Sequence, residues 1–258
     1  MRLLNGCFML LCADVSAACA GAWAPDKGTG KIIISEIETV QRRENISNFK
    51  HTETYRSVLV EYGLSDSLGV AVKSARSRRN APQYDVAAQD ETAQLGLIID
   101  TPALATGLLP PFTYRLLKAV LPFDTIQRQK RAAMTLGLHE TKDEFWTAFA
   151  LGDVISVVRF RVAQQAEYER INSAERDWRT WIYRFTLVYG AFDIGTEAQK
   201  FEDFNGTYAA LSHNYYVQWK PSTYSWGLRL KQGTSRAALN ATGVQKNDYS
   251  AIEIEFAF

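Results

Sequence analysis

The chain ends with the stretch Tyr249-Ser250-Ala251-Ile252-Glu253-Ile254-Glu255-Phe256-Ala257-Phe258, in which a large apolar side chain occupies every second position from Ile252 onward. Because successive side chains of a strand point to opposite faces, this alternation predicts a β-strand with one apolar and one polar face. A water-soluble sandwich can also contain such a strand, but we expect it to continue into a polar tail. The apolar face carries Ile252, Ile254, Phe256 and Phe258, and the polar face carries Ala251, Glu253, Glu255 and Ala257.

The same two-residue period recurs upstream, from Lys31 onward, and predicts strands along most of the chain. Several apolar faces end in an aromatic residue, as expected where a strand crosses the head-group region of a bilayer. The opposite faces carry charges of both signs, which suit the polar interior of a membrane barrel better than a soluble core. The clearest apolar faces are Val58-Val60-Tyr62, Leu95-Leu97-Ile99, Met134-Leu136-Leu138, Trp181-Tyr183-Phe185-Leu187-Tyr189, Tyr215-Val217-Trp219 and Trp226-Leu228-Leu230.

This inside-out pattern predicts an all-β fold, an antiparallel transmembrane up-and-down β-barrel, rather than a secreted sandwich or jelly roll. Single-chain bacterial barrels have even strand numbers, and we expect about 12 strands, with about 10 as the alternative. After residue 20 no uncharged apolar run approaches the roughly 18 residues of a spanning helix. A membrane crossing would therefore use strands, because only a closed barrel otherwise satisfies the backbone in hydrocarbon.

The connections between strands give a second expectation. With both termini in the periplasm, long and tight connections should alternate. Residues 103–130 do not fit the pattern, because Leu116, Leu117, Val120 and Leu121 follow a helical spacing. A short helix at the rim or in the lumen and an irregular strand pair both remain open there. The predicted long connections are 42–52, 80–90, 193–207 and 234–247, and the tight ones lie at 65–67 and 221–222.

The first 20 residues are typical of a secretory signal peptide. Arg2 supplies a positive charge, residues 3–12 are mostly apolar, and Ala18-Cys19-Ala20 fits an A-x-A cleavage site. Residues 21–258 would then form one barrel domain; a lipoprotein cleaved before Cys19 is the alternative. All three cysteines lie within residues 1–20, so we expect no disulfide, thiolate metal site or cysteine nucleophile in the mature chain.

The C-terminal strand, residues 249–258, resembles the assembly signal of Gram-negative outer-membrane β-barrel proteins, from which Ser250 departs. The mature start Gly21-Ala22-Trp23, followed by Pro25, Gly28 and Gly30, is similar to that of small proteobacterial barrels of unassigned function. The resemblance implies a place in the bacterial outer membrane, with lipid and lipopolysaccharide around the barrel. It also implies delivery to the outer-membrane insertion machinery, with an assembly signal formed by Ile252, Ile254, Phe256 and Phe258.

Charged residues on the polar faces are the candidates for lining the lumen. Glu253 and Glu255 should neighbour Arg229 and Lys231 on the preceding strand, and Glu61 and Lys73 should share a hairpin. Such charges form either ion pairs that satisfy buried charge or a pore lining that sets ion preference. The 29 basic and 28 acidic residues balance, which argues for little selectivity and against a nucleic-acid partner. The full set is Glu61, Lys73, Arg159, Arg161, Arg184, Arg229, Lys231, Glu253 and Glu255.

The sequence contains no recognisable catalytic or metal-binding motif. The three histidines have no metal-ligand spacing, and His51 is expected in an external loop. Outer-membrane hydrolases pair a lipid-facing His with a Ser two residues later, but His213 is followed at that position by Tyr215, and Ser212 should point to the opposite face. We therefore expect no enzyme, no metal and no cofactor.

Three functions remain open. The favoured one is a passive pore or transporter for small solutes or apolar molecules, with the substrate undetermined. The alternatives are a structural or adhesive barrel that acts through its external loops and, less favoured, a lipid-modifying hydrolase. The oligomeric state is also open.

Overall fold

The structure, a computed structural model, describes residues 24–43, 50–81, 86–100, 127–139, 145–157, 160–172, 177–203, 208–221, 223–239 and 243–258. Nearly all of these residues belong to β-strands of 12 to 16 residues. The strands are β1 Gly30–Arg43, β2 Lys50–Ser65, β3 Leu68–Ala81, β4 Val86–Asp100, β5 Gln127–His139, β6 Phe145–Val157, β7 Phe160–Asn172, β8 Asp177–Tyr189, β9 Phe192–Asp203, β10 Tyr208–Trp219, β11 Trp226–Leu239 and β12 Gly243–Ala257.

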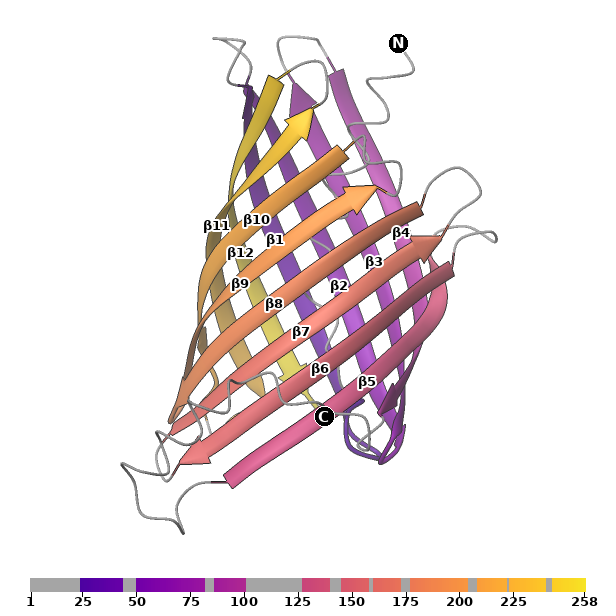
Figure 1. The fold of residues 1–258 in the computed structure, drawn as a ribbon, viewed down its shortest axis with the longest axis vertical. Helices are drawn as coiled ribbons and strands as arrows, with labels where there is room; N and C mark the ends of the chain where they lie inside the picture. Colours follow the sequence, from indigo (N-terminus) through magenta and orange to yellow (C-terminus); the bar gives the residue numbers. More distant parts are fainter. Residues whose placement is uncertain are drawn as a thin grey trace.

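The strands form one closed barrel (Figure 1). Each strand pairs antiparallel with its neighbours in sequence, and β1 also pairs with β12, from Lys31 opposite Ala257 to Arg43 opposite Gln245. A closed sheet leaves no strand without a neighbour on either side, although β4 and β5 pair only between Gln94–Asp100 and Ala133–His139. The predicted antiparallel up-and-down barrel is confirmed, and the strand number is 12.

Side chains alternate between the outside and the inside of the barrel in the predicted sense. On β12, Ile252 is 53% exposed, whereas the adjacent Glu253 is 2% exposed. On β8, Trp181 is 51% exposed and Ile182 is 2% exposed. Apolar side chains thus form a belt on the outside, and charged residues next to them in sequence, such as Glu253, lie inside. This is the reverse of a water-soluble protein and is the arrangement of a membrane barrel.

Above the apolar belt the outer wall becomes charged. Arg56 Nε lies 2.9 Å from Glu36 Oε2, and Arg76 Nε lies 3.3 Å from Glu91 Oε1. These exposed pairs lie toward the barrel end opposite Phe258, and we call the surface that they form the outer collar. About 9–11 tilted residues cross the hydrocarbon, so strands of 12 to 16 residues extend past it. The outer collar consists of Glu36, Arg42, Arg56, Arg76, Glu91, Arg236, Lys246 and Asp248.

The four predicted long connections are wrong in their bounds, because strands run through part of 42–52 and through most of the other three. In these stretches both faces of a strand carry polar residues, so the apolar alternation disappears while the strand continues. The tight turn is confirmed between Ser65 and Leu68, but the one at Pro221 is longer and occupies residues 220–225. The connections left where long ones were predicted are 44–49, 82–85, 204–207 and 240–242.

At the Phe258 end, residues 24–29 lie along β1 to β4. Gly28 N donates to Gly63 O at 3.0 Å, and Lys27 bridges to Gly63 in parallel. Gly28 has a φ of 77°, a left-handed conformation that glycine adopts without strain. Ala24 is buried in an inward-facing apolar cluster with Ile33, Leu59, Ala71 and Ile98.

Several predictions fall outside the described residues, among them the proposed signal peptide, residues 1–20, and the mature start Gly21-Ala22-Trp23. Of the irregular stretch 103–130, only residues 127–130 are described, and they belong to β5. Among the described residues, no helix has the length and hydrophobicity needed to cross a bilayer.

Candidate functional site

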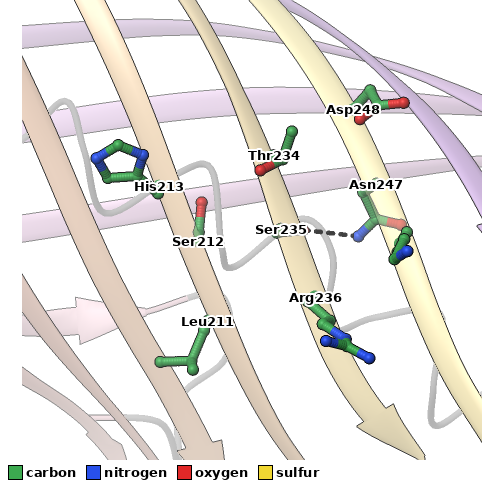
Figure 2. Close-up of a pocket in the computed structure, with 9 residues that line it drawn as sticks. Leu211, Ser212, His213, Thr234, Ser235, Arg236, Asn247 and Asp248 are labelled. Atoms are coloured by element: carbon green, nitrogen blue, oxygen red, sulfur yellow. Dashed lines mark hydrogen bonds between the residues drawn. The ribbon is translucent and has the colours of Figure 1, made fainter.

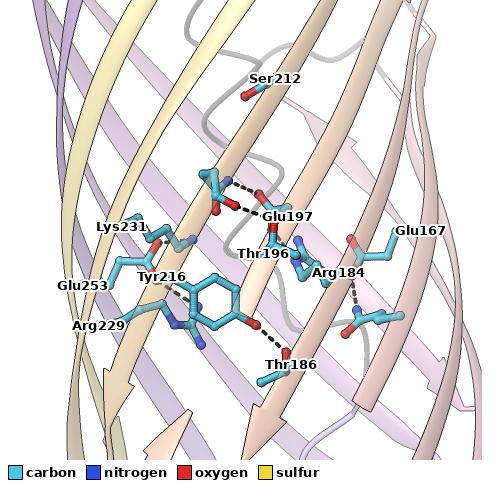
Figure 3. Close-up of polar contacts among 12 residues, drawn as sticks. Glu167, Arg184, Thr186, Thr196, Glu197, Ser212, Tyr216, Arg229, Lys231 and Glu253 are labelled. Atoms are coloured by element: carbon cyan, nitrogen blue, oxygen red, sulfur yellow. Dashed lines mark hydrogen bonds and ion pairs between the residues drawn. The ribbon is translucent and has the colours of Figure 1, made fainter. Parts of the chain in front are cut away.

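The inward-facing charges gather into clusters, the largest of them on β7 to β12 (Figure 3). Glu61, Lys73, Lys231 and Glu253 are buried, and Arg184, Arg229 and Glu255 are mostly buried. Arg161 is exposed near the start of β7, and Arg159 lies outside the described residues.

In the first cluster, one arginine bridges two carboxylates. Arg184 on β8 donates from Nη1 to Glu167 Oε1 on β7 at 2.6 Å and from Nε to Glu197 Oε2 on β9. Asn214 Nδ2 on β10 donates to the other oxygen of Glu197 at 3.1 Å. Glu169, two residues along the inward face of β7, is also buried. The cluster is acidic, and the guanidinium is held from both sides by charge-assisted hydrogen bonds.

The second cluster has the opposite charge balance, because one carboxylate lies between two cations. Glu253 on β12 lies 2.9 Å from Arg229 Nη1 and 2.7 Å from Lys231 Nζ, both on β11. Arg229 also donates to Gln218 Oε1, from Nη2 at 2.6 Å and from Nε at 3.0 Å. Gln218 Nε2 in turn donates to Glu255 Oε2 at 3.1 Å. A chain of polar contacts therefore crosses three neighbouring strands.

Tyr216 on β10 links the second cluster to Thr186 on β8, the strand that carries Arg184. Its ring lies under the guanidinium of Arg229, 5.3 Å from the ring centroid to Cζ, and its hydroxyl is hydrogen-bonded to Thr186 on β8. The ring lies next to Gly195 on β9, where a Cβ would collide with it. Tyr249 covers Gly233 in the same way, at 2.6 Å from Cζ to the position of a Cβ. Glycine at these positions thus holds two aromatic rings against the wall.

A smaller set of charges lies on β1 to β3. Lys31 Nζ is 2.6 Å from Glu61 Oε2, and Arg79 Nε is 3.4 Å from Glu53 Oε1. Lys73 lies over the Tyr55 ring, 5.8 Å from its centroid. Glu61 and Lys73 are on paired strands, as expected, but Glu61 is opposite Ala71 rather than Lys73.

The comparisons with known proteins come from structure alone. No family model matches the chain, and no curated protein matches it in sequence. An outer membrane channel from Pseudomonas putida F1 aligns over 93% of this chain and 98% of its own, with 9% identity and a TM-score of 0.52. The NanC porin aligns over 86% of this chain and 98% of its own, with 9% identity and a TM-score of 0.50. The fold is that of an outer-membrane β-barrel.

Within this outer-membrane fold, the predicted neighbours on the last two strands are only partly right. Glu253 contacts both Arg229 and Lys231, but Glu255 lies opposite Gly227 and contacts Gln218 and Lys220 instead. Lys220 Nζ is 3.6 Å from Glu255 Oε2. The two-residue period predicts which face of the sheet each side chain occupies. It does not predict that Glu255 reaches past Gly227 to residues beyond the neighbouring strand.

The sequence patterns did not predict several residues of the barrel interior. Glu197 and Gln218 are central to the clusters, but Glu197 fell in a stretch predicted as a long connection. Glu167 was not predicted because the apolar alternation on this strand is clear only at its start, around Arg161. His51, expected in an external loop, lies in β2 and is 1% exposed on the inside of the barrel. Its inward parity with Glu53 and Tyr55 was the signal available in the sequence.

His213 faces outward, as predicted, and Ser212 faces inward, where its hydroxyl is hydrogen-bonded to Tyr249 at 3.1 Å. The hydroxyl partner of His213 is Thr196, 2.8 Å from Oγ1 to Nε2. Thr196 Oγ1 also donates to Asn214 O at 2.9 Å. A hydroxyl that donates to a carbonyl accepts from the imidazole, so this nitrogen of His213 is not placed to remove the hydroxyl proton. The geometry favours a structural hydrogen bond over a hydrolytic pair.

Proposed function

We propose that the chain is an outer-membrane channel through which small solutes pass passively. The observation that carries this proposal is the polar interior of the barrel from β7 to β12. The acidic cluster around Arg184 and the cluster in which Glu253 lies between two cations place charged and amide groups along one wall of the lumen (Figure 3). Side chains with both signs of charge can replace part of the water around a polar or ionic solute.

We infer that the passage is narrow, because neighbouring side chains cover much of the inner wall. Gln218 on β10 is 1% exposed, and Glu61 on β2 is 0% exposed. Because positive and negative groups alternate, we infer weak selectivity between small cations and anions. This arrangement does not decide which small solutes pass, or whether apolar molecules pass.

Single-channel conductance of the refolded protein in a planar bilayer tests the proposal. We expect discrete openings of small conductance in the wild type. Arg229→Ala removes a fixed positive charge and should shift the reversal potential in a salt gradient toward cation preference. Glu255→Ala removes a negative charge and should shift it toward anion preference.

Arg56→Ala is the matched control, because this arginine pairs with Glu36 on the outer wall and does not face the lumen. Its reversal potential should equal that of the wild type. Shifts of the same sign in Arg229→Ala and Glu255→Ala would contradict a lumen lined by these residues.

The second candidate is a structural barrel that conducts nothing. The buried interior favours it, since a network of ion pairs also stabilises a closed wall. Its adhesive form has less support, because the connections at the collar end are short, for example 204–207 and 240–242. Complete absence of openings in the wild type, with a correctly folded barrel, would favour this candidate.

We further propose that residues 1–20 direct export, that the mature chain lies in the bacterial outer membrane with both termini in the periplasm, and that the insertion machinery recognises the C-terminal strand. The outward apolar belt and the resemblance of residues 249–258 to an assembly signal support these proposals. Lipid and lipopolysaccharide would then surround the belt.

A further inference from the structure

A patch of the inner wall near the Phe258 end is apolar. At the collar end of the lumen, inward side chains bond to one another instead, as Figure 2 shows for Asn247 Nδ2 and Ser235 Oγ at 2.9 Å. The interior of a membrane barrel is normally polar, so an apolar patch there is stable only where other groups shield it from water. Its four side chains are each 6% exposed or less. They are Ile33 on β1, Leu59 on β2, Ala71 on β3 and Ile98 on β4.

The start of the described chain, residues 24–29, covers part of this patch, and we call it the strap. Ala24 is 5% exposed and packs in the same cluster, so its side chain lies on the lumen side of four neighbouring strands. Its backbone N donates to Asp100 Oδ1 at the end of β4, at 3.2 Å. Residues 26–29 are exposed, whereas Ala24 is buried. The strap therefore runs from the mouth of the barrel into the lumen.

Two glycines form the slot in which the strap lies. Gly63 on β2 and Gly69 on β3 are direct register partners. A Cβ at Gly63 would collide with the carbonyl oxygens of both Pro25 and Asp26. A Cβ at Gly69 would lie 3.2 Å from Ala24 Cβ. Glycine within a strand is found where another backbone approaches closely, and here that backbone is the strap.

Backbone hydrogen bonds hold the strap in this slot. Gly28 N donates to Gly63 O at 3.0 Å, and Gly63 N donates to Thr29 O at 2.9 Å. Thr29 N also donates to Asp26 O at 3.0 Å, which closes a turn within the strap. The φ of Gly28, 77°, allows the chain to reverse direction at this turn. The strap is therefore bound to the wall along its length.

We propose that the strap sets the size limit of the channel by narrowing the lumen at the Phe258 end. Barrels of about eight strands are filled by side chains and those of about 16 enclose an aqueous channel, so 12 strands leave an intermediate bore. A second layer of backbone over four strands takes up a large share of that bore. The proposed cleavage after Ala20 would leave three residues before Ala24, which span about 10 Å at most. The inference rests on the proposed channel function and deepens it.

Single-channel conductance of the refolded mature chain with Gly63→Ala tests the inference. The three atoms nearest to the added methyl group belong to Pro25 and Asp26, so the strap must leave its slot. We expect openings about twofold larger than those of the wild type, because the narrowest part of the lumen widens. Ala24→Asp puts a carboxylate into the apolar cluster and should also expel the strap. This second variant decides the question if Gly63→Ala does not fold.

The matched control is Gly227→Ala. Gly227 is buried at the Phe258 end of β11, on the inward face that also carries Arg229. The three atoms nearest to a Cβ there belong to Lys220, Trp219 and Gln218, and none belongs to the strap. The control thus adds the same methyl group at the same end of the lumen, and its openings should not exceed those of the wild type.

A disulfide tests the position of the strap without conductance. Ala24→Cys combined with Gly69→Cys places two Cβ atoms 3.2 Å apart, close to the roughly 3.8 Å of a disulfide. Residues 21–258 contain no other cysteine, so oxidation should form one bond, measured as protection from maleimide that a reductant reverses. The oxidised form should conduct as the wild type does. Ala24→Cys with Gly227→Cys should form no bond, because β2, β1 and β12 lie between β3 and β11.

Three results would overturn the inference while the channel itself stands. Equal openings in the wild type and in the folded Gly63→Ala and Ala24→Asp variants would show that the strap does not limit the passage. Failure of the Ala24→Cys and Gly69→Cys pair to crosslink would show that the strap lies elsewhere. Smaller openings after oxidation of that pair than after its reduction would show that the open channel has released the strap. If neither the wild type nor any variant opens, the proposed channel fails and the size limit with it.

Discussion

Arg184 is the residue on which the first interior cluster depends, because its guanidinium contacts both Glu167 and Glu197. Replacing it by alanine leaves two buried carboxylates near each other without their shared cation. Breaking a buried pair by removing one partner costs about 3 kcal/mol. We expect Arg184→Ala to lower the thermal unfolding temperature of the detergent-refolded barrel clearly, as measured by the loss of the heat-resistant folded band on a gel.

The comparison for Arg184→Ala is Arg56→Ala on the outer wall. Arg56 makes one ion pair with Glu36, and both side chains are more than half exposed. Such exposed pairs contribute about 1 kcal/mol or less. Equal unfolding temperatures for the two variants would show that Arg184 does not stabilise the interior.

At the scale of single strands, β12 closes the barrel against β1. Phe258 N donates to Gly30 O at 2.9 Å, Gly30 N donates to Phe258 O at 2.8 Å, and the Phe258 ring stacks on Tyr62 with centroids 6.4 Å apart. Deleting Phe258 removes both backbone bonds and the ring contact. We expect much less folded protein in the outer membrane of cells that express this deletion, measured as the heat-modifiable fraction.

Two further measurements separate closure from recognition by the insertion machinery. Refolding into detergent uses no machinery, so a deletion that refolds normally there but fails in cells acts through recognition. Phe258→Ala keeps the two backbone bonds and should assemble better than the deletion. Tyr189→Ala, at an exposed aromatic residue near the end of β8, should assemble as the wild type does. Normal insertion of the deletion would contradict both roles.

The strands also show how far the sequence alone reaches. Where one face is lipid-facing, as from Trp181 to Tyr189, the two-residue period predicted the strand and the orientation of its side chains. Where both faces of a strand carry polar residues, the alternation is lost, and the residues around 193–207 on β9 and around 234–247 in the outer collar therefore looked like connections. Clusters such as Arg184 with Glu167 depend on the register between two neighbouring strands, which the period along one strand does not contain.

For the whole molecule, the absence of cysteine from residues 21–258 makes the proposed orientation testable. Arg42→Cys places a thiol on the outer collar, and Asp66→Cys places one in the tight turn at the Phe258 end; both positions are exposed. With both termini in the periplasm, a membrane-impermeant maleimide applied to intact cells should label the Arg42 variant and not the Asp66 variant. Opening the outer membrane should expose both.

The wild-type protein is the control for this labelling, and it also tests the signal peptide. Cys7, Cys12 and Cys19 all lie in the segment expected to be removed. Wild-type protein from the membrane should therefore remain unlabelled even after denaturation. A labelled wild type would show that cysteines are retained, and labelling of Asp66→Cys alone in intact cells would reverse the proposed orientation.

The glycines beneath Tyr216 and Tyr249 have a consequence for how barrels of this kind diverge. A methyl group at Gly195 or Gly233 would collide with the ring above it and also with a backbone carbonyl of a neighbouring strand, Phe185 O or His213 O, each 2.6 Å from the added carbon. A single-nucleotide change at either codon would therefore displace the wall as well as the ring. Descendants that keep the same spacing of strands at these two positions are thus expected to keep both glycines.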